Sequence, residues 1–355
     1  MNRPLISYIL ATYNQQQFIR EAVESAIAQT YSPLEIILSD DHSTDNTFEI
    51  AKKTAGPYNG PHSIRLNRNS MNLGIGGNVN RAMDLCRGEL VVGAAGDDVS
   101  LPMRTELIWR AWEESGRRAT SIFSSYSAMS REGVAQTHET ARESQGDSRG
   151  WKRLEGELRD FLLRRSPVVY GCTHAWSRRL FDYFGPLRSD LEDSVLSFRT
   201  LAIGEMLYIE QPLVKYRRHG GNVSFYAGRD VPLSFEGREK RLRWVDEQSV
   251  MAFDNILADI ETLYRKGRIA SLERARLSAI ARRIRDGYLL ERQLMDGTFL
   301  DRLAVLAGEA KCGNLPGVLR SLARALPRPI YRALYALREK WRRSAQAVHS
   351  GASAI

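Results

Sequence analysis

The chain has 355 residues, of which 43% are hydrophobic and 26% are charged, and its net charge is +9. This composition is ordinary for a globular protein and excludes a disordered, collagen-like or disulfide-scaffold chain. No run of about 20 apolar residues occurs, so the sequence predicts no membrane-spanning helix. Cys86, Cys172 and Cys312 lie far apart, and the N-terminal residues lack the pattern of a secretory signal. We therefore expect free thiols in a cytoplasmic protein.

The first 130 residues alternate short apolar runs with segments of helical periodicity. The predicted strands cover Leu5–Ala11, Leu34–Ser39, Ile64–Leu66, Glu89–Ala95 and Thr120–Tyr126. The predicted helices between them cover Phe18–Thr30, Asn46–Thr54, Asn78–Cys86 and Arg104–Ser115. This alternation predicts parallel βαβ units and an α/β fold with a doubly wound, mostly parallel sheet.

Beyond this part the pattern changes twice. Residues 130–150 are polar and rich in Gly and Ser, which predicts a surface loop. From about residue 236 the periodicity is purely helical, with expected helices over Glu236–Tyr264, Ile269–Leu294 and Phe299–Ala310. We therefore divide the chain into a domain of residues 1–230, a helical region of residues 231–310 and a tail of residues 311–355.

The positive charge is concentrated in the C-terminal third. Residues 231–355 hold 23 Lys and Arg against 14 Asp and Glu, so they account for the whole net charge. In the tail, arginines recur beside apolar residues at helical spacing, together with Trp341. A basic amphipathic helix of this kind is typical of a protein that binds an anionic membrane surface. We expect peripheral binding to the inner face of the cell membrane; packing of the tail on the protein is the alternative. No nucleic-acid-binding module surrounds the charge, so no nucleic-acid partner is expected.

Polar residues follow three of the predicted strands. Thr12 and Tyr13 follow the first strand, Asp40 and Asp41 the second, and Asp97 with Asp98 the strand that ends at Ala95. Ligands of open parallel sheets bind at the carboxyl ends of the strands. Adjacent carboxylates repel each other, and a divalent cation such as Mg²⁺ or Mn²⁺ offsets that repulsion.

Helix capping is the simpler explanation for such aspartates. We accept it for Asp45, which precedes a predicted helix, and leave Asp40 and Asp41 open between capping and ligand roles. It is weaker for Asp97 and Asp98, because Pro102 and several other residues intervene before the next helix.

In their order and spacing, these segments resemble the family 2 glycosyltransferases, which have the GT-A fold. The resemblance extends over about residues 1–225, and it is the ordered set of motifs rather than any single one that is specific. His42 stands where the family usually has Gly, and Val79 where many members have Arg. The matching segments are Ser7–Asn14, Ile36–Asp45, Asn72–Gly74, Asn80, Gly88–Leu90, Gly96–Asp98, Leu191–Asp193, and Tyr216–His219 with Asn222 and Ser224.

The resemblance implies a metal-dependent, inverting transferase. It would move a sugar from a nucleotide-diphosphate sugar to a hydroxyl of a glycan or lipid-linked acceptor in cell-surface polysaccharide synthesis, with Mn²⁺ or Mg²⁺ as cofactor. Residues 1–230 would form the catalytic GT-A domain. Thr12 and Tyr13 would bind the nucleobase, Tyr13 by stacking, and Asp41 would accept a hydrogen bond from its imide N–H. Asp97 would hold the ribose or the metal shell.

The same resemblance assigns residues to metal binding, to diphosphate binding and to proton transfer. Asp98 would ligate the metal, and His219 would contact the diphosphate or complete the metal shell. Arg217 would add positive charge near the phosphates. Asp193 resembles the general base that takes the acceptor's proton, with Glu192 as the fallback. Taken alone, that pair would be read as carboxylates favoured at a helix N-terminus.

Several readings stay open at this point. His174 and Trp176 either line the acceptor pocket or belong to the core. The glycine-rich segment Gly74–Gly77 does not directly follow a convincing strand, and the chain has no Gly-Lys-Ser/Thr triplet, so a P-loop is excluded. A non-catalytic nucleotide-binding scaffold and a basic adaptor for membrane or RNA are the alternative functions.

Overall fold

The computed structural model describes residues 3–135, 150–164, 169, 171–222 and 234–311, and six positions between 326 and 333. Contacts divide the chain into two compact units. The first contains Met1–Gly228 and Met251–Arg282, and the second contains Arg229–Val250 and Arg283–Ile355. Most of the predicted loop of residues 130–150 and nearly all of the tail of residues 311–355 lie outside the described residues.

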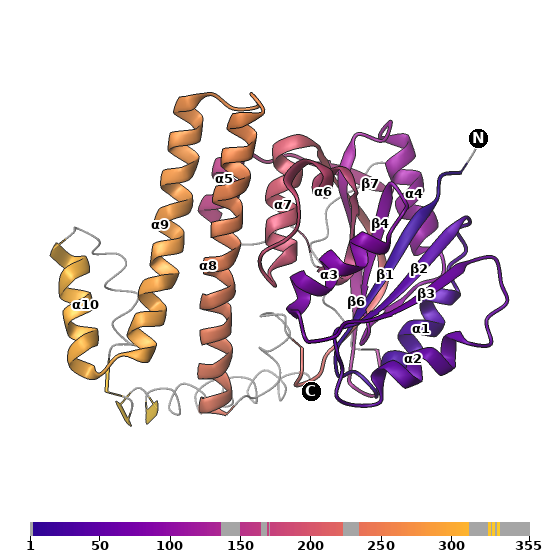
Figure 1. Cartoon of the computed structure of the whole chain (residues 1–355), viewed down its shortest axis with the longest axis horizontal. Coiled ribbons are helices and arrows are strands. Elements are labelled where there is room, and N and C mark those ends of the chain that lie inside the picture. The colour runs from indigo at the N-terminus through magenta and orange to yellow at the C-terminus, as the bar shows by residue number, and fades with distance from the viewer. Residues whose placement is uncertain are drawn as a thin grey trace, which may run out of the picture. The chain divides into compact units, whose positions relative to one another are not determined.

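The described part of the first unit contains a nine-stranded sheet (Figure 1). Its main path runs β3-β2-β1-β4-β8-β6-β9-β5, and β7 pairs with β9. The pairs β3–β2, β2–β1 and β1–β4 are parallel, whereas β8 is antiparallel to both of its neighbours. The strands are β1 (Ile6–Thr12), β2 (Leu34–Asp40), β3 (Ser63–Arg68), β4 (Leu90–Ala95), β5 (Val99–Ser100), β6 (Ala119–Met129), β7 (Trp151–Leu154), β8 (His174–Ser177) and β9 (Glu205–Arg217).

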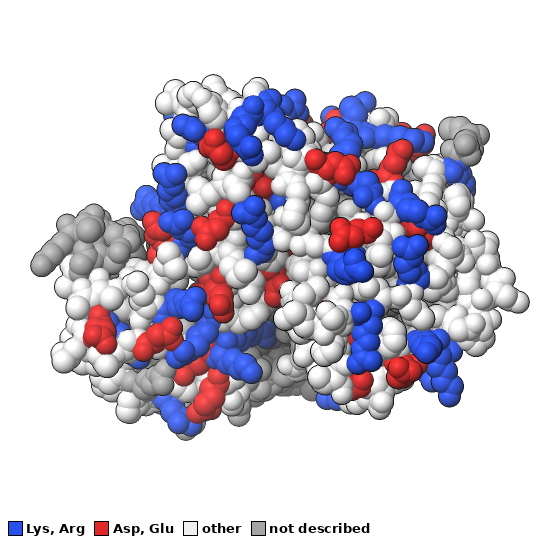
Figure 2. All heavy atoms as spheres, in the orientation of Figure 1, with Lys and Arg blue, Asp and Glu red and all other residues white. Residues whose placement is uncertain are grey.

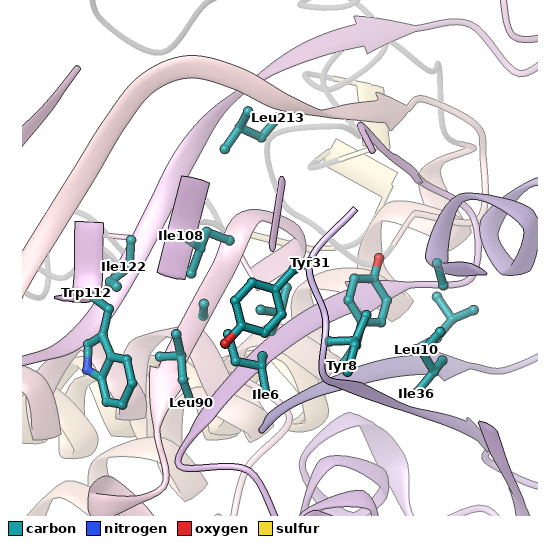
Figure 3. Close-up of a cluster of buried hydrophobic side chains, with 14 of the residues drawn as sticks. Ile6, Tyr8, Leu10, Tyr31, Ile36, Leu90, Ile108, Trp112, Ile122 and Leu213 are labelled. Atoms are coloured by element: carbon teal, nitrogen blue, oxygen red, sulfur yellow. The ribbon is translucent and has the colours of Figure 1, made fainter. Parts of the chain in front are cut away.

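Helices cover both faces of the sheet, because its parallel strands β1, β2 and β4 are buried and mostly apolar on both sides. Alternate residues of β1 point to opposite faces: Ile6, Tyr8 and Leu10 enter one core cluster, whereas Ile9 enters another. Figure 3 shows the first cluster, with Trp112 and Ile108 packed near the strand residues. It includes residues of α1 (Ile19–Ile27), α2 (Thr47–Ala55) and α4 (Arg104–Glu114). The second includes residues of α3 (Gly74–Leu85), α6 (Arg179–Phe184) and α7 (Glu192–Ile203).

The C-terminal helices match the periodicity of the sequence. They are α8 (Phe235–Arg265), α9 (Ser271–Asp296) and α10 (Phe299–Lys311). The end of α8 belongs to the first unit, where the Arg199 guanidinium of α7 and the Asp259 carboxylate of α8 form a buried ion pair at 2.8 Å. In the second unit, Leu290 and Leu294 of α9 pack with Leu306 of α10. The predicted class, a mostly parallel α/β sheet followed by a helical C-terminal region, is confirmed.

Three local features differ from the sequence-based expectation. α3 begins at Gly74 rather than at Asn78, and its N-terminus is held by side chains from distant segments. The long strand β9 was not predicted, because Glu210, Gln211 and Pro212 interrupt its apolar pattern, and its register with β6 shifts in the same stretch. Asp45 lies one residue before the observed N-cap of α2, yet its carboxylate accepts the Thr47 N–H at 3.0 Å. Two short helical elements, α5 (Leu158–Arg164) and η1 (Gly171–Thr173), complete the first unit.

Acidic and basic side chains are interspersed over the face of the molecule in Figure 2. Across the described ranges, no helix combines the length and the apolarity that crossing a bilayer requires. The predicted membrane-binding tail stays a prediction, since only scattered positions of it are described.

Candidate active site

The strand order brings the three predicted polar strand ends together. β1 lies between β2 and β4, with Thr12 opposite Asp40 and Ala11 opposite Ala95 in the parallel registers. The carboxyl ends of all three strands therefore meet at one edge of the sheet, within the first unit. The backbone at Gly96 packs closely against the Thr12 side chain, since a Cβ at Gly96 would lie 2.6 Å from the Thr12 Oγ1.

Asp40, the last residue of β2, and Asp41, which follows it, have different hydrogen-bond partners. Asp40 is buried and accepts the Ser43 N–H at 3.0 Å, so it fixes the loop that follows. The Asp41 Oδ1 accepts hydrogen bonds from the Asn69 side-chain amide (2.8 Å) and the Leu73 N–H (2.9 Å). His42, which follows Asp41, has φ of 61°. This is the left-handed region that favours glycine, the residue expected here from the family resemblance.

Tyr13 presents an aromatic ring at the end of β1. Tyr13 is 45% exposed, which is high for an aromatic residue at the end of a buried strand. Thr12 is buried and donates from its hydroxyl to Gln15 Oε1 at 2.8 Å, so the turn that carries Tyr13 is tied to the strand end. A fixed, exposed ring at the edge of the sheet is suited to stacking on a planar ligand.

Asp97 meets His219, which lies 122 residues further along the chain. The His219 Nε2 is 2.9 Å from the Asp97 Oδ2. The Asn222 side-chain amide also donates to that oxygen, at 3.4 Å, and the Gly221 N–H donates to the His219 Nδ1 at 3.1 Å. Both side chains are therefore oriented by their neighbours, with the carboxylate and the imidazole facing each other.

Asp98 points elsewhere. Its Oδ1 accepts the Arg217 backbone N–H at 2.8 Å, and its buried Oδ2 has no hydrogen-bond partner among the described residues. Burial, with a further contribution from the neighbouring Asp97 charge, raises the pKa of Asp98 well above its ordinary value. Asp98 is 4% exposed and Asp97 8%, so both side chains are buried.

Arg217 is enclosed rather than open to a phosphate. Its side chain is 1% exposed, and its guanidinium donates to the carbonyl oxygens of Asp97 and Arg131 and to the Glu21 carboxylate. The sequence suggested a phosphate contact; the structure gives the guanidinium protein acceptors instead. It holds the β9 end that carries His219 against the loop that carries Asp97.

The donor set at Asp97 fits a divalent cation. A carboxylate oxygen and an imidazole nitrogen are ligands that Mn²⁺ accepts, and Mg²⁺ commonly takes one or two carboxylates together with substrate phosphates. Across the part of the chain that the structure describes, no group of three or more His, Cys, Asp or Glu is placed to hold a metal ion. A cation held here would therefore need ligands from its substrate.

The predicted base pair stands at the first turn of α7. Burial raises the pKa of Asp193 to about 6, although its Oδ1 accepts the Ser194 N–H at 2.7 Å. Burial, and after it the Asp193 charge, raises the pKa of Glu192 well above its ordinary value. Glu192 packs on Gly171, where any Cβ would overlap its carboxylate.

Hydrogen bonds link Asp41 to the loop that precedes α7, because Asp41 accepts the Leu73 N–H and Asp190 the Gly76 N–H at the start of α3. The Asp41 charge contributes to the raised pKa of Asp190, and the Asp190 charge contributes to that of Glu192, in both cases after burial. Cys172, next to Gly171, has a pKa raised by burial and then by Asp98 and Asp97. Gly171 of the short helix η1 packs on the Glu192 carboxylate, and η1 also contacts β4.

Sequence reasoning missed Asp190, which accepts the Gly76 N–H at 2.9 Å. Its signal was present as a third carboxylate three residues before Asp193. No local pattern, however, shows that its partner lies on another helix.

The family model for "Glycosyl transferase family 2" matches residues 7–184, about half of the chain. The chain belongs to this family. Among curated relatives, EpsE of Bacillus subtilis is 36% identical over 103 residues, which cover 29% of this chain and 36% of EpsE. EpsH of the same organism is 29% identical over 235 residues, which cover 62% of each chain. Both names describe candidate glycosyltransferases, and the matches span less than two thirds of either relative's length.

A solved structure also resembles the chain. It is the mannosyltransferase PcManGT from Pyrobaculum calidifontis in complex with GDP-Man and Mn²⁺, with a TM-score of 0.48 and 19% identity over 94% of this chain and 84% of that one.

In this family 2 chain, His174 and Trp176 belong to the core. Both are buried on β8, the His174 Nε2 is 2.5 Å from the Ser121 Oγ, and the Trp176 N–H points to the Met83 sulfur. Burial lowers the pKa of His174 to about 3, so the ring is neutral. The structure thus decides between the two readings that the sequence left open.

Proposed function

We propose that the protein is an inverting, metal-dependent glycosyltransferase that uses a nucleotide-diphosphate sugar. The observation that carries the proposal is that, in a family 2 chain, Asp41 at the carboxyl edge of the sheet and Asp190 in the loop before α7 both bind the N-terminus of α3. The proposal uses two acidic groups. One group, Asp41 with Asp97, is fixed by hydrogen bonds from neighbouring segments. The other, Glu192 with Asp193, has raised pKa values.

The donor nucleotide is proposed to bind over β1 and β2. Tyr13 stacks on the base, and Asp41 accepts the imide N–H with the carboxylate oxygen that does not bind Leu73 and Asn69. Thr12 and Gln15 keep the Tyr13 turn in place.

Asp97 and His219 are proposed to hold the cation, Mn²⁺ or Mg²⁺. Bound there with the diphosphate, it would neutralise the negative charge that develops on the leaving nucleotide. We assign the ligand role to Asp97 because its Oδ2 faces His219. The Asp98 Oδ2, which is buried with no hydrogen-bond partner among the described residues, is the alternative ligand. With Asp97 as the ligand, Asp98 and Arg217 act by fixing the positions of the two ligands.

Asp193 is proposed to be the general base. With a pKa of about 6 it is ionised at neutral pH and still basic enough to accept a proton from a sugar hydroxyl. Burial and the Asp193 charge raise the pKa of the neighbouring Glu192 carboxyl. The deprotonated hydroxyl attacks the anomeric carbon from the face opposite the leaving diphosphate, so one displacement inverts the configuration.

The acceptor is proposed to be a glycan or a lipid-linked precursor of a cell-surface polysaccharide. The basic tail of residues 311–355 supports this choice, because it is suited to an anionic membrane surface on which such precursors are held.

A donor screen tests the function. UDP-, GDP- and dTDP-sugars are added with and without Mn²⁺, the midpoint of thermal unfolding is measured, and donors that bind are followed for hydrolysis or transfer. We expect one nucleotide class to raise the midpoint only with the cation and to be turned over. Binding without turnover of any donor would instead support a nucleotide-binding scaffold, and the absence of binding would contradict the proposal.

A further inference from the structure

The glycine-rich segment Gly74–Gly77 has a role in this structure that the sequence did not reveal. It forms the first turn of α3, and it faces the loop that leads into α7. Gly74 has φ of 77°, and a Cβ there would lie 2.5 Å from the Asp190 Oδ1. A Cβ at Gly76 would overlap the carbonyl oxygen of Ser189. The glycines therefore make room for a close approach of the loop.

The same loop is attached to α3 at a second place. Asn80 donates from its side-chain amide to the Leu187 carbonyl and accepts the Leu187 N–H, both at 2.8 Å. The next residue, Arg188, donates its N–H to the Asn255 Oδ1 of α8 at 2.9 Å. Three hydrogen bonds therefore fix residues 187 and 188, and the Asp190 contact fixes the part nearest the base pair.

Asp190 joins this loop to the donor side of the site. Its Oδ1 accepts the Gly76 N–H at 2.9 Å, while Asp41 accepts the Leu73 N–H of the same helix end at 2.9 Å. Two carboxylates from different segments thus accept backbone N–H groups, three residues apart, at one helix N-terminus, which favours negative charge. One of them is the proposed nucleobase ligand, and the other precedes the proposed general base by three residues.

We propose that Asp190 is a positioning residue, which docks the loop of the general base on the first turn of α3 and thereby sets the distance between Asp193 and the donor held at Asp41. This inference rests on the proposed function. Asp41 is also held by Asn69 and by its own N–H, which donates to the Thr12 carbonyl at 2.9 Å, so loss of Asp190 releases the base side while leaving the donor side in place. Misplacing a reacting group by about 1 Å costs up to about 100-fold in rate.

The test compares Asp190→Ala, which removes the hydrogen-bond acceptor, with Asp190→Asn, which keeps an amide oxygen for the Gly76 N–H. We expect Asp190→Ala to lower kcat about 10- to 100-fold. The Kd of the free nucleoside diphosphate with Mn²⁺, measured by calorimetry, should change by less than about twofold, because the donor contacts remain. Asp190→Asn should restore kcat to within about fivefold of the wild type, since the acceptor is kept.

Asp301→Ala is the matched control. The Asp301 carboxylate accepts the Thr298 N–H at 2.8 Å near the N-terminus of α10, in the second unit, so this variant loses a similar contact far along the chain from the site. Its kcat should equal that of the wild type.

Three results would overturn the role of Asp190 while leaving the proposed function intact. They are a wild-type kcat in Asp190→Ala, an equal loss of nucleotide affinity and kcat, and the absence of rescue in Asp190→Asn. A wild-type protein that turns over no donor would instead refute the proposed function and the positioning role together.

Discussion

Asp41 and Asp97, the proposed donor-side carboxylates, and Glu192 and Asp193, the proposed base-side pair, are held in different ways. Asp41 and Asp97 follow buried parallel strands, and side chains and N–H groups of distant segments donate to them. Asp193 accepts from Ser194, its own neighbour, and Glu192 packs on a glycine. In the first arrangement donors from distant segments fix the carboxylates; in the second, burial raises the pKa values of Glu192 and Asp193.

The two arrangements suit two different chemical tasks, ligand binding and proton transfer. A group that binds a cation or a base N–H must stay ionised and fixed, whereas a general base must take up a proton during the reaction. Four predictions test whether the two groups divide the work in this way.

The largest effect is expected for Asp193→Asn. The amide has a similar shape but accepts no proton, so kcat should fall by about 10²–10⁴-fold, the usual worth of a general base. Donor binding, measured by calorimetry with Mn²⁺, should stay close to that of the wild type. Glu192→Gln is the comparison: a larger loss there than at position 193 would make Glu192 the base.

Asp97→Asn should affect donor binding rather than proton transfer. We expect metal-dependent nucleotide affinity to fall by about 100-fold, because one of the two proposed protein ligands loses its charge. Asp98→Asn keeps an oxygen for the Arg217 N–H and should cost less than about tenfold. The reverse order of the two losses, measured as nucleotide Kd at fixed Mn²⁺, would return the ligand role to Asp98.

The pH dependence of kcat/KM gives a further test. Only the deprotonated form of Asp193 accepts a proton, and burial raises its pKa to about 6. Activity should therefore rise with pH, reach half of its plateau near that pKa, and fall about tenfold for each pH unit below it. A profile that stays flat down to pH 5 would mean that no group with such a pKa limits the reaction.

The smallest effect is expected for Tyr13→Ala. Stacking of a base on an aromatic ring contributes about 1–3 kcal/mol, and at the lower end of that range, expected for a half-exposed ring, donor Kd should rise about five- to tenfold. Tyr13→Phe keeps the ring and should bind as the wild type does. An unchanged Kd in the alanine variant would remove the ring from the donor site.

The sequence predicted the fold well where the signal is local. The strands of β1, β2 and β4 are continuous apolar runs, and their ends were found to within about two residues. α8, α9 and α10 follow their helical periodicity closely. The sequence did not predict β9, because three consecutive residues break its apolar pattern. The strand forms through its pairing with β6.

Site residues could be proposed from the sequence because the polar strand ends and the acidic pair of α7 stand out against apolar runs. Their partners could not. That Asp97 faces His219, that Arg217 points inward and that Asp190 binds Gly76 depend on segments more than 100 residues apart.

The sequence by itself determined the alternating elements, the family motifs and the residue types available for chemistry, because hydrophobic periodicity and turn-forming residues act over short stretches of chain. Only the tertiary structure decided which aspartate meets a histidine, which arginine is enclosed and which carboxylates lose their water. Those outcomes depend on burial and on contacts between distant segments, which exist only when the sheet and its covering helices have packed.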